Sequence, residues 1–428
     1  METPAELAGM ERRFAIFMDI LDKYGLTKVI NARGPSTILG SAKCVEPVRQ
    51  AVADALTVNV EMVELQARLS RYIARFSGAE AGCATGCTAA GIAVAVAACM
   101  TGDNLALIKE LPFGRDLKRK FVIQKGHIIM AGEAPIYQLV RICGGDLEEV
   151  GEAADCGVYQ LENALDEQTA AALYVMGGRA DTVGMIPPRR FIQACRERDI
   201  PVIVDDASGL HVRDLISWGA DLVIFSCQKW LSGPTAGLIA GRRDLVYACF
   251  LQDNGIGRPM KVGKEGIFGA MEAIHQWEQA EAPAADEKQA MVRYMQKRLE
   301  NIPGVTAVVE QSSLSGSPGW LLVTVDPKTA NIPVYEISRR LGDHRPVIRT
   351  HDYDFALNYF SIDPVMMEPG DEEIVCDALE KIFKEAAAAA PWDHTMERPT
   401  RLDVVAEWMR SWLWREQAFR DGESQSNE

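Results

Sequence analysis

Short apolar segments alternate with longer amphipathic segments through the first half of this chain. The stretch 188–198, for example, is long enough for a helix and separates two of the apolar segments. Strands that alternate with helices form a mostly parallel sheet that is covered on both faces. The sequence therefore predicts an α/β fold. The segments that we expect to be strands are LALI (105–108), FVIQ (121–124), ALYVM (172–176), PVIVDD (201–206) and DLVIFS (221–226).

The pattern changes near residue 284, where a charged helical segment (286–301) begins. Strand-like segments and a second short helix follow it, as expected for a smaller α+β domain. The end of the chain carries Trp408, Trp412 and Trp414 on an amphipathic helix. We divide the chain into four parts, namely an N-terminal helix and loop (1–45), a large domain (46–283), a small C-terminal domain (284–390) and a helical tail (391–428).

The composition disfavours several classes of protein. The 428 residues include 45 basic and 60 acidic side chains, and the net charge of −15 argues against a nucleic-acid partner. The longest apolar run, 89–100, is too short to cross a bilayer, and no apolar signal-peptide core is present. The ten cysteines show no CxxC or CxxH spacing, so we expect no metal site. Free thiols in a chain of this size fit a reducing cytoplasm.

An acid and a lysine follow two neighbouring apolar segments. Asp205 ends the segment 201–206 together with Asp206, and Lys229 comes three residues after Ser226, where the next segment ends. In open α/β sheets the ligand site lies at the carboxyl ends of the strands, so we expect these side chains to meet there. A structural ion pair between Asp205 and Lys229 is the alternative interpretation.

A loop of small residues, ATGCT (84–88), leads directly into an apolar helical segment. Amide groups at the start of a helix bind phosphate, and a glycine such as Gly86 lets the backbone approach the ligand closely. Glycine- and alanine-rich helix starts also serve packing, so this feature alone is weak. The chain contains no Walker A motif and no full GxGxxG motif.

Together these segments resemble the pyridoxal-phosphate (PLP) enzymes of fold type I. More narrowly, the chain resembles the branch that contains bacterial selenocysteine synthase and the D-glucosaminate-6-phosphate ammonia-lyase family. The resemblance covers about residues 25–385 and implies a large PLP-binding domain with a mostly parallel sheet beside the small α+β domain. It rests on VINARGPSTILG (29–40), ATGCTAAG (84–91), IQKGHIIMAGEAPIYQLVRICGGDLEEVG (123–151), the block 205–241 and GRPMKVGKEGIFGA (257–270).

The resemblance implies a role for each polar residue described above. Lys229 would hold pyridoxal 5'-phosphate covalently and then act as the base at the substrate α-carbon. Asp205 would pair with the pyridine nitrogen and keep it protonated; Asp206 is the alternative, and the strand register favours Asp205. The phosphate of the cofactor would be bound by Ser226, Gly86, Cys87 and Thr88.

The resemblance also implies residues around the cofactor and the substrate. His127 would lie over the cofactor ring, with an ordinary loop histidine as the alternative. Arg349, on a late strand of the small domain, would bind the substrate carboxylate in bidentate fashion. Arg33 and Thr37 of the N-terminal loop would contact the substrate.

A basic, glycine-rich segment (254–269) contains Arg258, Lys261 and Lys264. We expect it to be a loop that reaches outward to the cofactor or substrate region of a neighbouring subunit, with Arg258 among the cofactor-binding residues. A solvated basic loop is the alternative. A site completed across a two-fold interface implies a homodimer or a higher even oligomer.

The function that this resemblance implies is that of a PLP-dependent lyase for a small-molecule amino acid or amino-sugar acid. Such an enzyme removes the α-proton, eliminates a β-substituent and releases a 2-oxo acid and ammonia. Transfer or racemisation on a small amino acid is the alternative, and a cofactor-binding protein without catalysis is a third possibility that the intact Asp205 and Lys229 oppose. Selenocysteine synthesis on tRNA is disfavoured, because only about 25 residues precede the shared core and the chain is acidic.

Overall fold

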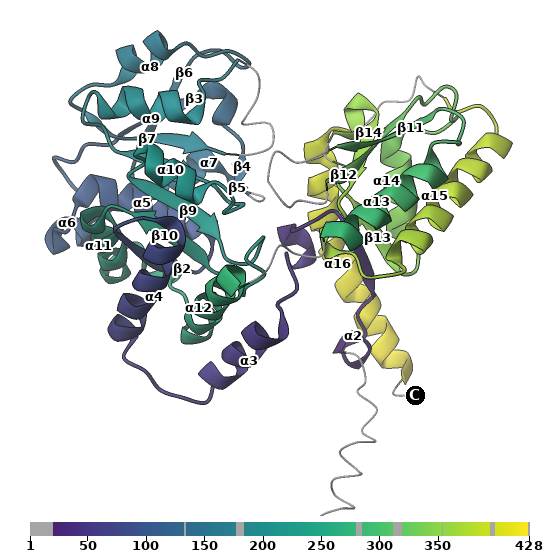
Figure 1. The fold of residues 1–428 in the computed structure, drawn as a ribbon, viewed down its shortest axis with the longest axis horizontal. Helices are drawn as coiled ribbons and strands as arrows, with labels where there is room; N and C mark the ends of the chain where they lie inside the picture. Colours follow the sequence, from purple (N-terminus) through teal and green to yellow (C-terminus); the bar gives the residue numbers. More distant parts are fainter. Residues whose placement is uncertain are drawn as a thin grey trace, which may run out of the picture. The chain divides into compact units, whose positions relative to one another are not determined.

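The computed structural model describes residues 20–131, 134–176, 184–279, 285–310, 319–352, 354–393 and 399–426. The chain divides into two compact units (Figure 1). One is Pro35–Glu281, which we call the large unit. The other combines Met1–Gly34 with Ala282–Glu428, and we call it the small unit.

A seven-stranded sheet forms the centre of the large unit. Neighbouring strands run parallel except at β10, which is antiparallel to both of its neighbours, β2 and β9. The mostly parallel sheet of an α/β fold, predicted from the sequence, is therefore confirmed. In spatial order the strands are β2 (Ala81–Thr85), β10 (Gly237–Gly241), β9 (Leu222–Ser226), β8 (Val202–Asp205), β7 (Thr169–Val175), β3 (Lys120–Gln124) and β6 (Asp146–Val150).

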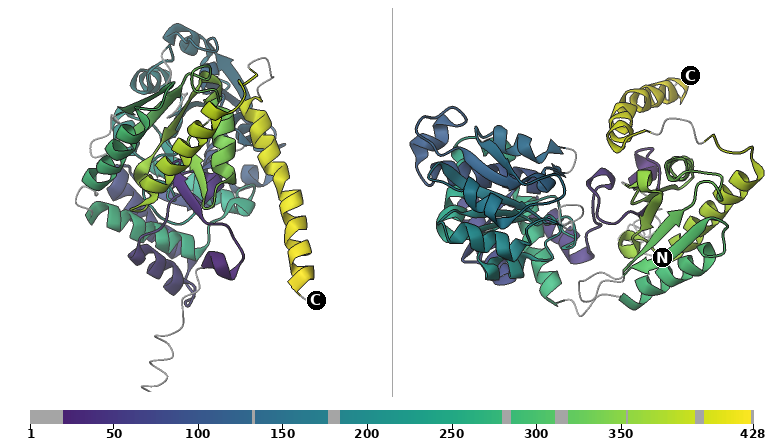
Figure 2. Two further views of the ribbon diagram at one scale, coloured as in Figure 1. Left: turned by 90° about the vertical axis from the view of Figure 1, so that its right-hand side faces the viewer. Right: turned by 90° about the horizontal axis from the view of Figure 1, so that it is seen from above.

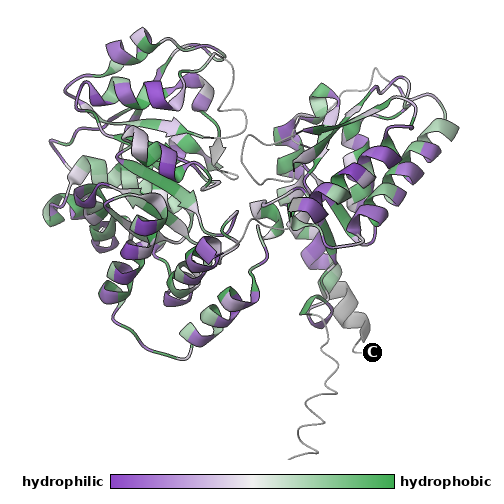
Figure 3. Ribbon diagram, viewed as in Figure 1, coloured by the Kyte–Doolittle hydropathy of each residue, from purple (hydrophilic) through white to green (hydrophobic). Residues whose placement is uncertain are grey.

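Both faces of this sheet are buried, and Figure 3 shows its strands coloured mainly as hydrophobic. In β8, Val202 and Val204 belong to one hydrophobic cluster and Ile203 to another. Because successive side chains of a strand point to opposite faces, an unbroken apolar strand needs helices on both sides. Helices α5, α7 and α11 cover the face of Ile203, and α4, α8, α9, α10 and α12 cover the other.

The helices of the large unit follow in chain order. They are α3 (Glu46–Ala55), α4 (Met62–Ser77), α5 (Thr88–Thr101), α6 (Leu105–Glu110), α7 (Ile136–Arg141), α8 (Val158–Ala164), α9 (Pro188–Arg196), α10 (Val212–Trp218), α11 (Arg243–Leu251) and α12 (Lys264–Gln279). The shorter elements are η1 (Thr37–Leu39), η2 (Lys125–His127), η4 (Gln252–Asn254), η5 (Arg258–Met260) and the small pair β4 (Met130–Ala131) and β5 (Ala134–Pro135).

The segment 105–108, predicted to be a strand, is instead the start of α6. The side chain of Asn104 caps this helix, because its Oδ1 accepts the N–H groups of Ala106 at 3.0 Å and Leu107 at 3.3 Å. Of the residues in α6 only Ile108 is buried. A run of four apolar residues fits either structure, and the N-cap residue decides in favour of the helix.

The segment 29–40, predicted to be a loop, begins with a strand, β1 (Val29–Ala32). Its partner is β13 (Val347–Thr350), with which it runs parallel. The sequence around residue 30 could not indicate this strand, because its hydrogen bonds go to a segment near the other end of the chain. Of the N-terminal helix expected before residue 25, residues 1–19 lie outside the described residues, and α2 (Ile20–Lys23) is helical.

The small unit contains an antiparallel sheet of three strands in the order β11, β12, β14. Leu321, Val323 and Phe360 lie on its buried face, against a core to which α13 and α15 contribute. The small α+β arrangement predicted from the sequence is confirmed. Its elements are α13 (Ala285–Leu299), β11 (Val305–Glu310), β12 (Trp320–Val325), α14 (Val334–Asp343), η6 (Phe355–Leu357), β14 (Tyr359–Ile362), η7 (Pro364–Met366), α15 (Asp371–Ala388) and α16 (Arg401–Ser426).

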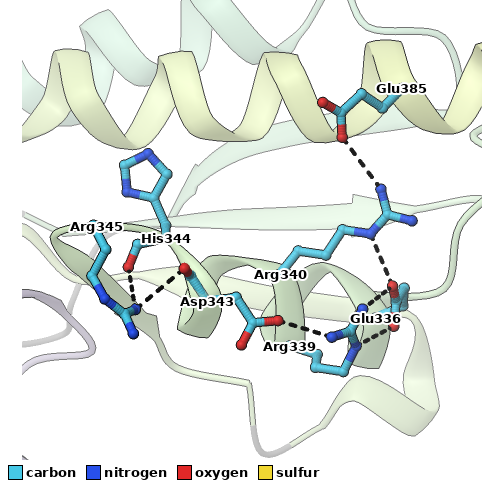
Figure 4. Close-up of polar contacts among 7 residues, drawn as sticks. All are labelled: Glu336, Arg339, Arg340, Asp343, His344, Arg345 and Glu385. Carbon is cyan, nitrogen blue, oxygen red and sulfur yellow. Dashed lines mark hydrogen bonds and ion pairs between the residues drawn. The ribbon is translucent and has the colours of Figure 1, made fainter. Parts of the chain in front are cut away.

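A group of ion pairs on α14 includes one that reaches the neighbouring helix α15 (Figure 4). Glu336 accepts hydrogen bonds from Arg339 and Arg340, and these bonds, first of all that from Arg339, lower the pKa of its carboxyl group. Arg340 lies 3.7 Å from Glu385 on α15. These pairs lie near the surface, where each contributes on the order of 1 kcal/mol or less, so they orient α14 more than they stabilise it.

The tail helix α16 appears as the long helix at the C-terminus in Figure 2. Its tryptophans are largely exposed, with 66% of Trp412 and 54% of Trp414 accessible to solvent. Within the described ranges, no helix is both long and apolar enough to cross a membrane.

Truncation of Phe225 should destabilise the large unit. The ring of this β9 residue is fully buried and stacks on Phe76 of α4 at a centroid distance of 5.7 Å. Phe225→Ala should lower the free energy of unfolding by about 3–5 kcal/mol, because the truncation leaves a cavity that the sheet cannot fill. Urea denaturation followed by circular dichroism measures the change. The matched control is Phe113→Ala at an exposed position, and equal effects of both variants would contradict the prediction.

Candidate active site

Asp205 and Lys229 reach the same edge of the large sheet. Asp205 is the last residue of β8, and Lys229 lies three positions beyond β9, the parallel neighbour of β8. A tight turn carries the lysine. In this turn the N–H of Ser232 donates to the Lys229 carbonyl at 3.0 Å, and the N–H of Gly233 donates to the Cys227 carbonyl at 2.9 Å. The turn therefore fixes the backbone of the lysine beside the end of β8.

The carboxyl group of Asp205 is buried, with 6% of the residue exposed. Its Oδ1 has no hydrogen-bond partner in the part of the chain that the structure describes. Burial raises the pKa of Asp205 to about 7, and the charge of Lys229 opposes this rise. A buried polar atom without a partner costs about 1–3 kcal/mol. The edge of the sheet is therefore suited to a ligand that donates a hydrogen bond to Asp205.

Lys229 is half-buried beside this carboxyl group. Desolvation lowers the pKa of its amine, and the nearby carboxylates of Asp205 and Asp206 act in the opposite direction. A lowered pKa increases the fraction of neutral amine, which is the form that attacks a carbonyl carbon. The surroundings of Lys229 thus favour a nucleophile over a permanently paired cation.

Asp206, the alternative partner for a cofactor, is used within the protein itself. Its Oδ1 accepts a hydrogen bond from Ser208 Oγ at 2.5 Å, and its Oδ2 accepts one from the N–H of His211 at 2.9 Å. The Nδ1 atom of His211 also lies 3.6 Å from Oδ1. These contacts hold the loop that leads into α10. The oxygen without a partner therefore belongs to Asp205.

His127 lies at the same edge, directly after β3 in η2. Its Nδ1 accepts the N–H of Val175 at 3.2 Å, and Val175 pairs with Asp205 in the sheet. The ring packs edge-on against Tyr174, with centroids 4.5 Å apart, and no surface of the residue is exposed. The structure thus brings His127 next to β7 and β8. These contacts equally suit a buried histidine that supports the end of the sheet.

The predicted phosphate loop leads into α5, whose first residue is Thr88. The side chain of Cys87 caps this helix by accepting the N–H of Ala90 at 3.5 Å. The first N–H groups of a helix have no partner within the helix, so the amide of Thr88 suits an anion. The amide of Gly86 was expected to bind phosphate, but in the structure it donates to the Met260 carbonyl at 2.8 Å. Gly86 therefore joins this loop to η5 in the described conformation.

Ser226, at the end of β9, is buried opposite Gly237 of β10. A side chain at Gly237 would come within 2.2 Å of the Cys87 carbonyl oxygen. The glycine therefore lets the turn before α5 lie directly against the sheet. As a result, Ser226 and the start of α5 converge on the same edge as Lys229.

The basic segment 254–269 is only in part the outward loop that we expected. From Lys264 onward it forms the first turns of α12, in which Gly266, Ile267 and Gly269 are buried. The earlier part, η5, packs beside Gly86 of the same chain. This part of the segment is helical rather than an outward loop because the apolar face of α12 packs against α3 and α4.

A cavity of about 450 Å³ lies beside η5 and α4 in the large unit. Arg258, Lys261 and Lys264 line it, together with Asp253. Desolvation raises the pKa of Asp253, and the charges of Arg258 and Lys261 oppose this rise. The three cations therefore gather on one side of the large unit.

Arg33 and Thr37, both expected to contact substrate, have different surroundings. Arg33 is buried in the small unit, where its Nη1 donates to Asp352 Oδ1 at 3.0 Å and to the Thr350 carbonyl at 3.3 Å. This ion pair ties the end of β1 to the end of β13. Thr37 is exposed in η1 of the large unit.

Arg349 is paired with Asn31 in the register of β13 and β1. Within the described residues, its guanidinium has no hydrogen-bond or ion-pair partner. Desolvation lowers the pKa of Arg349, and the charges of Arg33 and Arg415 add to this effect against that of Asp352. A desolvated guanidinium without a carboxylate can bind an anionic group in bidentate fashion.

Sequence reasoning missed two residues that shape this site. The N–H of His211 donates to Asp206, and the carbonyl of Met260 accepts from the N–H of Gly86. For His211 a signal exists, since the spacing DDASGLH places its N–H five residues after Asp206. For Met260 there is none, because its carbonyl acts through the backbone.

Two relatives that are more than 30% identical to this chain match most of it. The 5'-C-glycyluridine monooxygenase-decarboxylase of a Streptomyces species is 34% identical over 369 residues, which cover 85% of this chain and 92% of that protein. The D-glucosaminate-6-phosphate ammonia lyase of Salmonella typhimurium is 32% identical over 369 residues, covering 86% of this chain and 99% of that protein.

Solved structures give the same result. A D-glucosaminate-6-phosphate ammonia-lyase structure, 32% identical, aligns with a TM-score of 0.76 over 87% of this chain and 100% of that chain. An aspartate aminotransferase of Thermus thermophilus aligns with a TM-score of 0.51 over 90% of this chain and 97% of that chain. At 14% identity this second likeness shows the fold alone, which is that of fold type I PLP enzymes.

The sequence model of one family, described as L-seryl-tRNA selenium transferase (SelA), matches residues 29–315. This range includes the ends of β8 and β9, the start of α5 and the basic segment before α12. Together with the two relatives above 30% identity, the match shows that the chain belongs to the L-seryl-tRNA selenium transferase (SelA) family.

Proposed function

We propose that this protein is a PLP-dependent lyase of the ammonia-lyase type. It would act at the α-carbon of an amino acid or amino-sugar acid, eliminate a β-substituent and release a 2-oxo acid and ammonia. The observation that carries the proposal is the buried Asp205 oxygen without a partner, one strand away from Lys229. The 32% identity to an ammonia lyase along nearly its whole length supports this reaction type.

Pyridoxal 5'-phosphate fits the residues at this edge of the sheet. Asp205 Oδ1 offers the acceptor that a protonated ring nitrogen needs, and Lys229 offers the amine that binds an aldehyde. The helix start at Thr88, together with Cys87 and Ser226, offers donors for a phosphate. When bound, the cofactor withdraws electrons from the substrate α-carbon and so weakens the bonds to that carbon.

The protein's own residues would hold and transfer protons and bind the substrate. Asp205 keeps the proton on the ring nitrogen, because a carboxylate beside a cation raises the pKa of that cation. Lys229 takes the proton from the α-carbon once its amine is released. Arg349, whose guanidinium has no partner among the described residues, would bind a carboxylate of the substrate. His127 would support the ring face beside β7.

A second reaction is favoured by one relative in particular. The monooxygenase-decarboxylase is 34% identical to this chain, and the match covers 92% of that protein. The same site could then remove the carboxylate as carbon dioxide with consumption of oxygen. Transfer and racemisation remain further alternatives at the same α-carbon. Relatives named as selenium transferases are more distant, for example 26% identical for the Caldanaerobacter subterraneus protein.

We further propose a homodimer or higher even oligomer in the cytoplasm, without a nucleic-acid or membrane partner. Exposed apolar residues support self-association, namely Leu56, Val58, Met62 and Val63 beside α3 and α4, and Trp412 on α16. All ten cysteines are free, which fits a reducing compartment. The net charge of −15 disfavours nucleic acid.

Product analysis separates these reactions. Elimination should give equal amounts of ammonia and 2-oxo acid from a β-hydroxylated amino acid, and it should proceed without oxygen. The measurement is a parallel assay of both products under air and under nitrogen, across D- and L-amino acids and amino-sugar acids. Carbon dioxide release that stops under nitrogen would favour the decarboxylase instead, and amino exchange with an added 2-oxo acid would favour transfer.

The cofactor should be bound covalently at Lys229. Borohydride reduction followed by peptide mapping should place the pyridoxyl group there, because Lys229 is the lysine with a lowered pKa at the end of β9. Lys229→Ala should reduce turnover by several powers of ten, since the attachment point and the base are lost together. Lys297→Ala, at an exposed position of α13, is the control. Labelling at Lys125, Lys261 or Lys264 would disprove the assignment.

The neighbours Asp205 and Asp206 should respond differently to the same substitution. Asp205→Asn removes the charge that favours a protonated ring nitrogen, an effect of roughly 1–3 pKa units. We expect weaker cofactor binding and a loss of kcat of about 100-fold or more, since electrostatic stabilisation of this kind is a large catalytic contribution. Asp206→Asn should mainly lower thermal stability, because it weakens the contacts to Ser208 and His211. We would compare the two variants by cofactor titration, by kcat and by their unfolding midpoints. A greater loss of kcat in Asp206→Asn than in Asp205→Asn would reverse the assignment.

A further inference from the structure

Two serines near Lys229 have a backbone conformation that residues with a side chain rarely adopt. In the described part of the chain, six residues other than glycine have a positive φ. Four of them are aspartate or asparagine, the residue types that tolerate this conformation best. The other two are Ser232, in the turn that carries Lys229, and Ser41, whose φ is 63°. Strain of this kind persists only where the surrounding structure imposes it, and it is concentrated at functional sites.

Two hydrogen bonds fix the backbone of Ser41 beside the turn of the lysine. Its own N–H donates to the Ser36 carbonyl at 2.8 Å. The N–H of the next residue, Ala42, donates to the Gln228 carbonyl at 3.0 Å. All of these residues belong to the large unit, as does Lys229. Ser41 is therefore held next to the residue that directly precedes the lysine.

The hydroxyl group of Ser41 is buried without a partner. Only 5% of the residue is exposed, and its Oγ has no hydrogen-bond partner among the described residues. A serine hydroxyl can donate one hydrogen bond and accept two, and leaving such a group buried and unpaired destabilises the folded protein. Alanine would avoid this cost, and glycine would avoid both this cost and the backbone strain. Ser41 is thus unfavourable for the folded protein in two ways.

The groups around Ser41 are already engaged elsewhere. The Oε1 atom of Gln228 accepts a hydrogen bond from Thr235 Oγ1 at 2.5 Å. Cys44, three residues after Ser41, packs against the apolar core, and burial raises the pKa of its thiol. At the same edge of the sheet, Asp205 Oδ1 is also buried without a partner among the described residues. Two unpaired polar atoms near one lysine indicate a ligand that pairs with both.

We propose that Ser41 is a ligand-contacting residue of the Lys229 edge, and that its hydroxyl donates a hydrogen bond to an oxygen atom of the ligand bound there. The inference rests on the proposed function, because it requires a ligand at Lys229. Pyridoxal 5'-phosphate and an amino acid both carry anionic oxygens, which accept stronger hydrogen bonds than neutral ones. The acceptor chemistry is therefore common to cofactor and substrate, and experiment can separate the two.

The first experiment compares two ligands by absorbance titration. Pyridoxal 5'-phosphate is added to the cofactor-free protein, and D- and L-serine are added to the loaded protein. We expect Ser41→Ala to weaken one of these affinities about tenfold, because an oxygen of the ligand loses its donor. Weaker cofactor binding assigns the contact to the cofactor, and weaker serine binding assigns it to the substrate. Unchanged cofactor affinity, together with equal serine affinity or with no serine binding at all, would overturn the inference.

The second experiment measures thermal unfolding of the cofactor-free protein. Ser41→Ala should raise the unfolding midpoint by about 2 °C, because an unpaired buried hydroxyl is removed. Ser41→Gly should raise it further, since it also relieves the positive φ. Asp199→Gly is the matched control, because Asp199 is exposed before the start of β8 with a φ of 56°. It should gain stability and keep its cofactor affinity. Lower midpoints in both Ser41 variants would show that the hydroxyl stabilises the protein itself and would refute the proposal.

The inference and the proposed function fail in different ways. If the unchanged protein does not bind pyridoxal 5'-phosphate at Lys229, the proposed lyase is refuted, and the inference with it. If the unchanged protein binds the cofactor at Lys229 and Ser41→Ala binds both ligands equally well, only the role of Ser41 is refuted.

Discussion

Because both faces of the central strands of the large sheet are buried, charged side chains can be accommodated only at the ends of these strands. Strands such as β8 and β9 carry apolar side chains on each side, so a charged side chain within them would lose its hydration without compensation. Asp205 and Lys229 avoid the interior of the sheet by lying at or beyond the ends of their strands. Even there, Asp205 is desolvated enough to raise its pKa to about 7. The candidate site is thus the place where the core ends and the cost of burial can be offset by a ligand.

Much of this arrangement could be predicted from the sequence, because it depends on local patterns. The apolar runs before Asp205 and Ser226 indicate buried parallel strands, and the order of elements brings their ends together. Features that depend on distant partners could not be predicted. Strand β1 forms because β13 supplies its hydrogen bonds, and Gly86 lies against η5 because the Met260 carbonyl accepts from it. The prediction of a strand at 105–108 was wrong, because the side chain of Asn104 caps a helix there and the four apolar residues that follow fit a helix as well as a strand.

The two adjacent aspartates show how a structure adds to a motif. In the sequence they are equivalent carboxylates, and only the strand register favours the first. In the structure Asp206 is occupied by Ser208 and His211, and Asp205 keeps one oxygen without a partner among the described residues. Relatives of similar identity carry out an elimination and an oxidative decarboxylation, according to their names. The edge of the sheet that carries Asp205 and Lys229 therefore does not by itself decide which of these reactions takes place.

The pairing of β1 with β13 also affects how the chain is made. Arg33, just after β1, hydrogen-bonds to the carbonyl of Thr350, 317 positions later. At a synthesis rate of about 5–20 residues per second, β1 waits roughly 15–60 s for its partner to leave the ribosome. The large unit, Pro35–Glu281, is complete well before that moment. Nascent chains would therefore carry a complete large unit while β1, which precedes it, still lacks its partner strand β13.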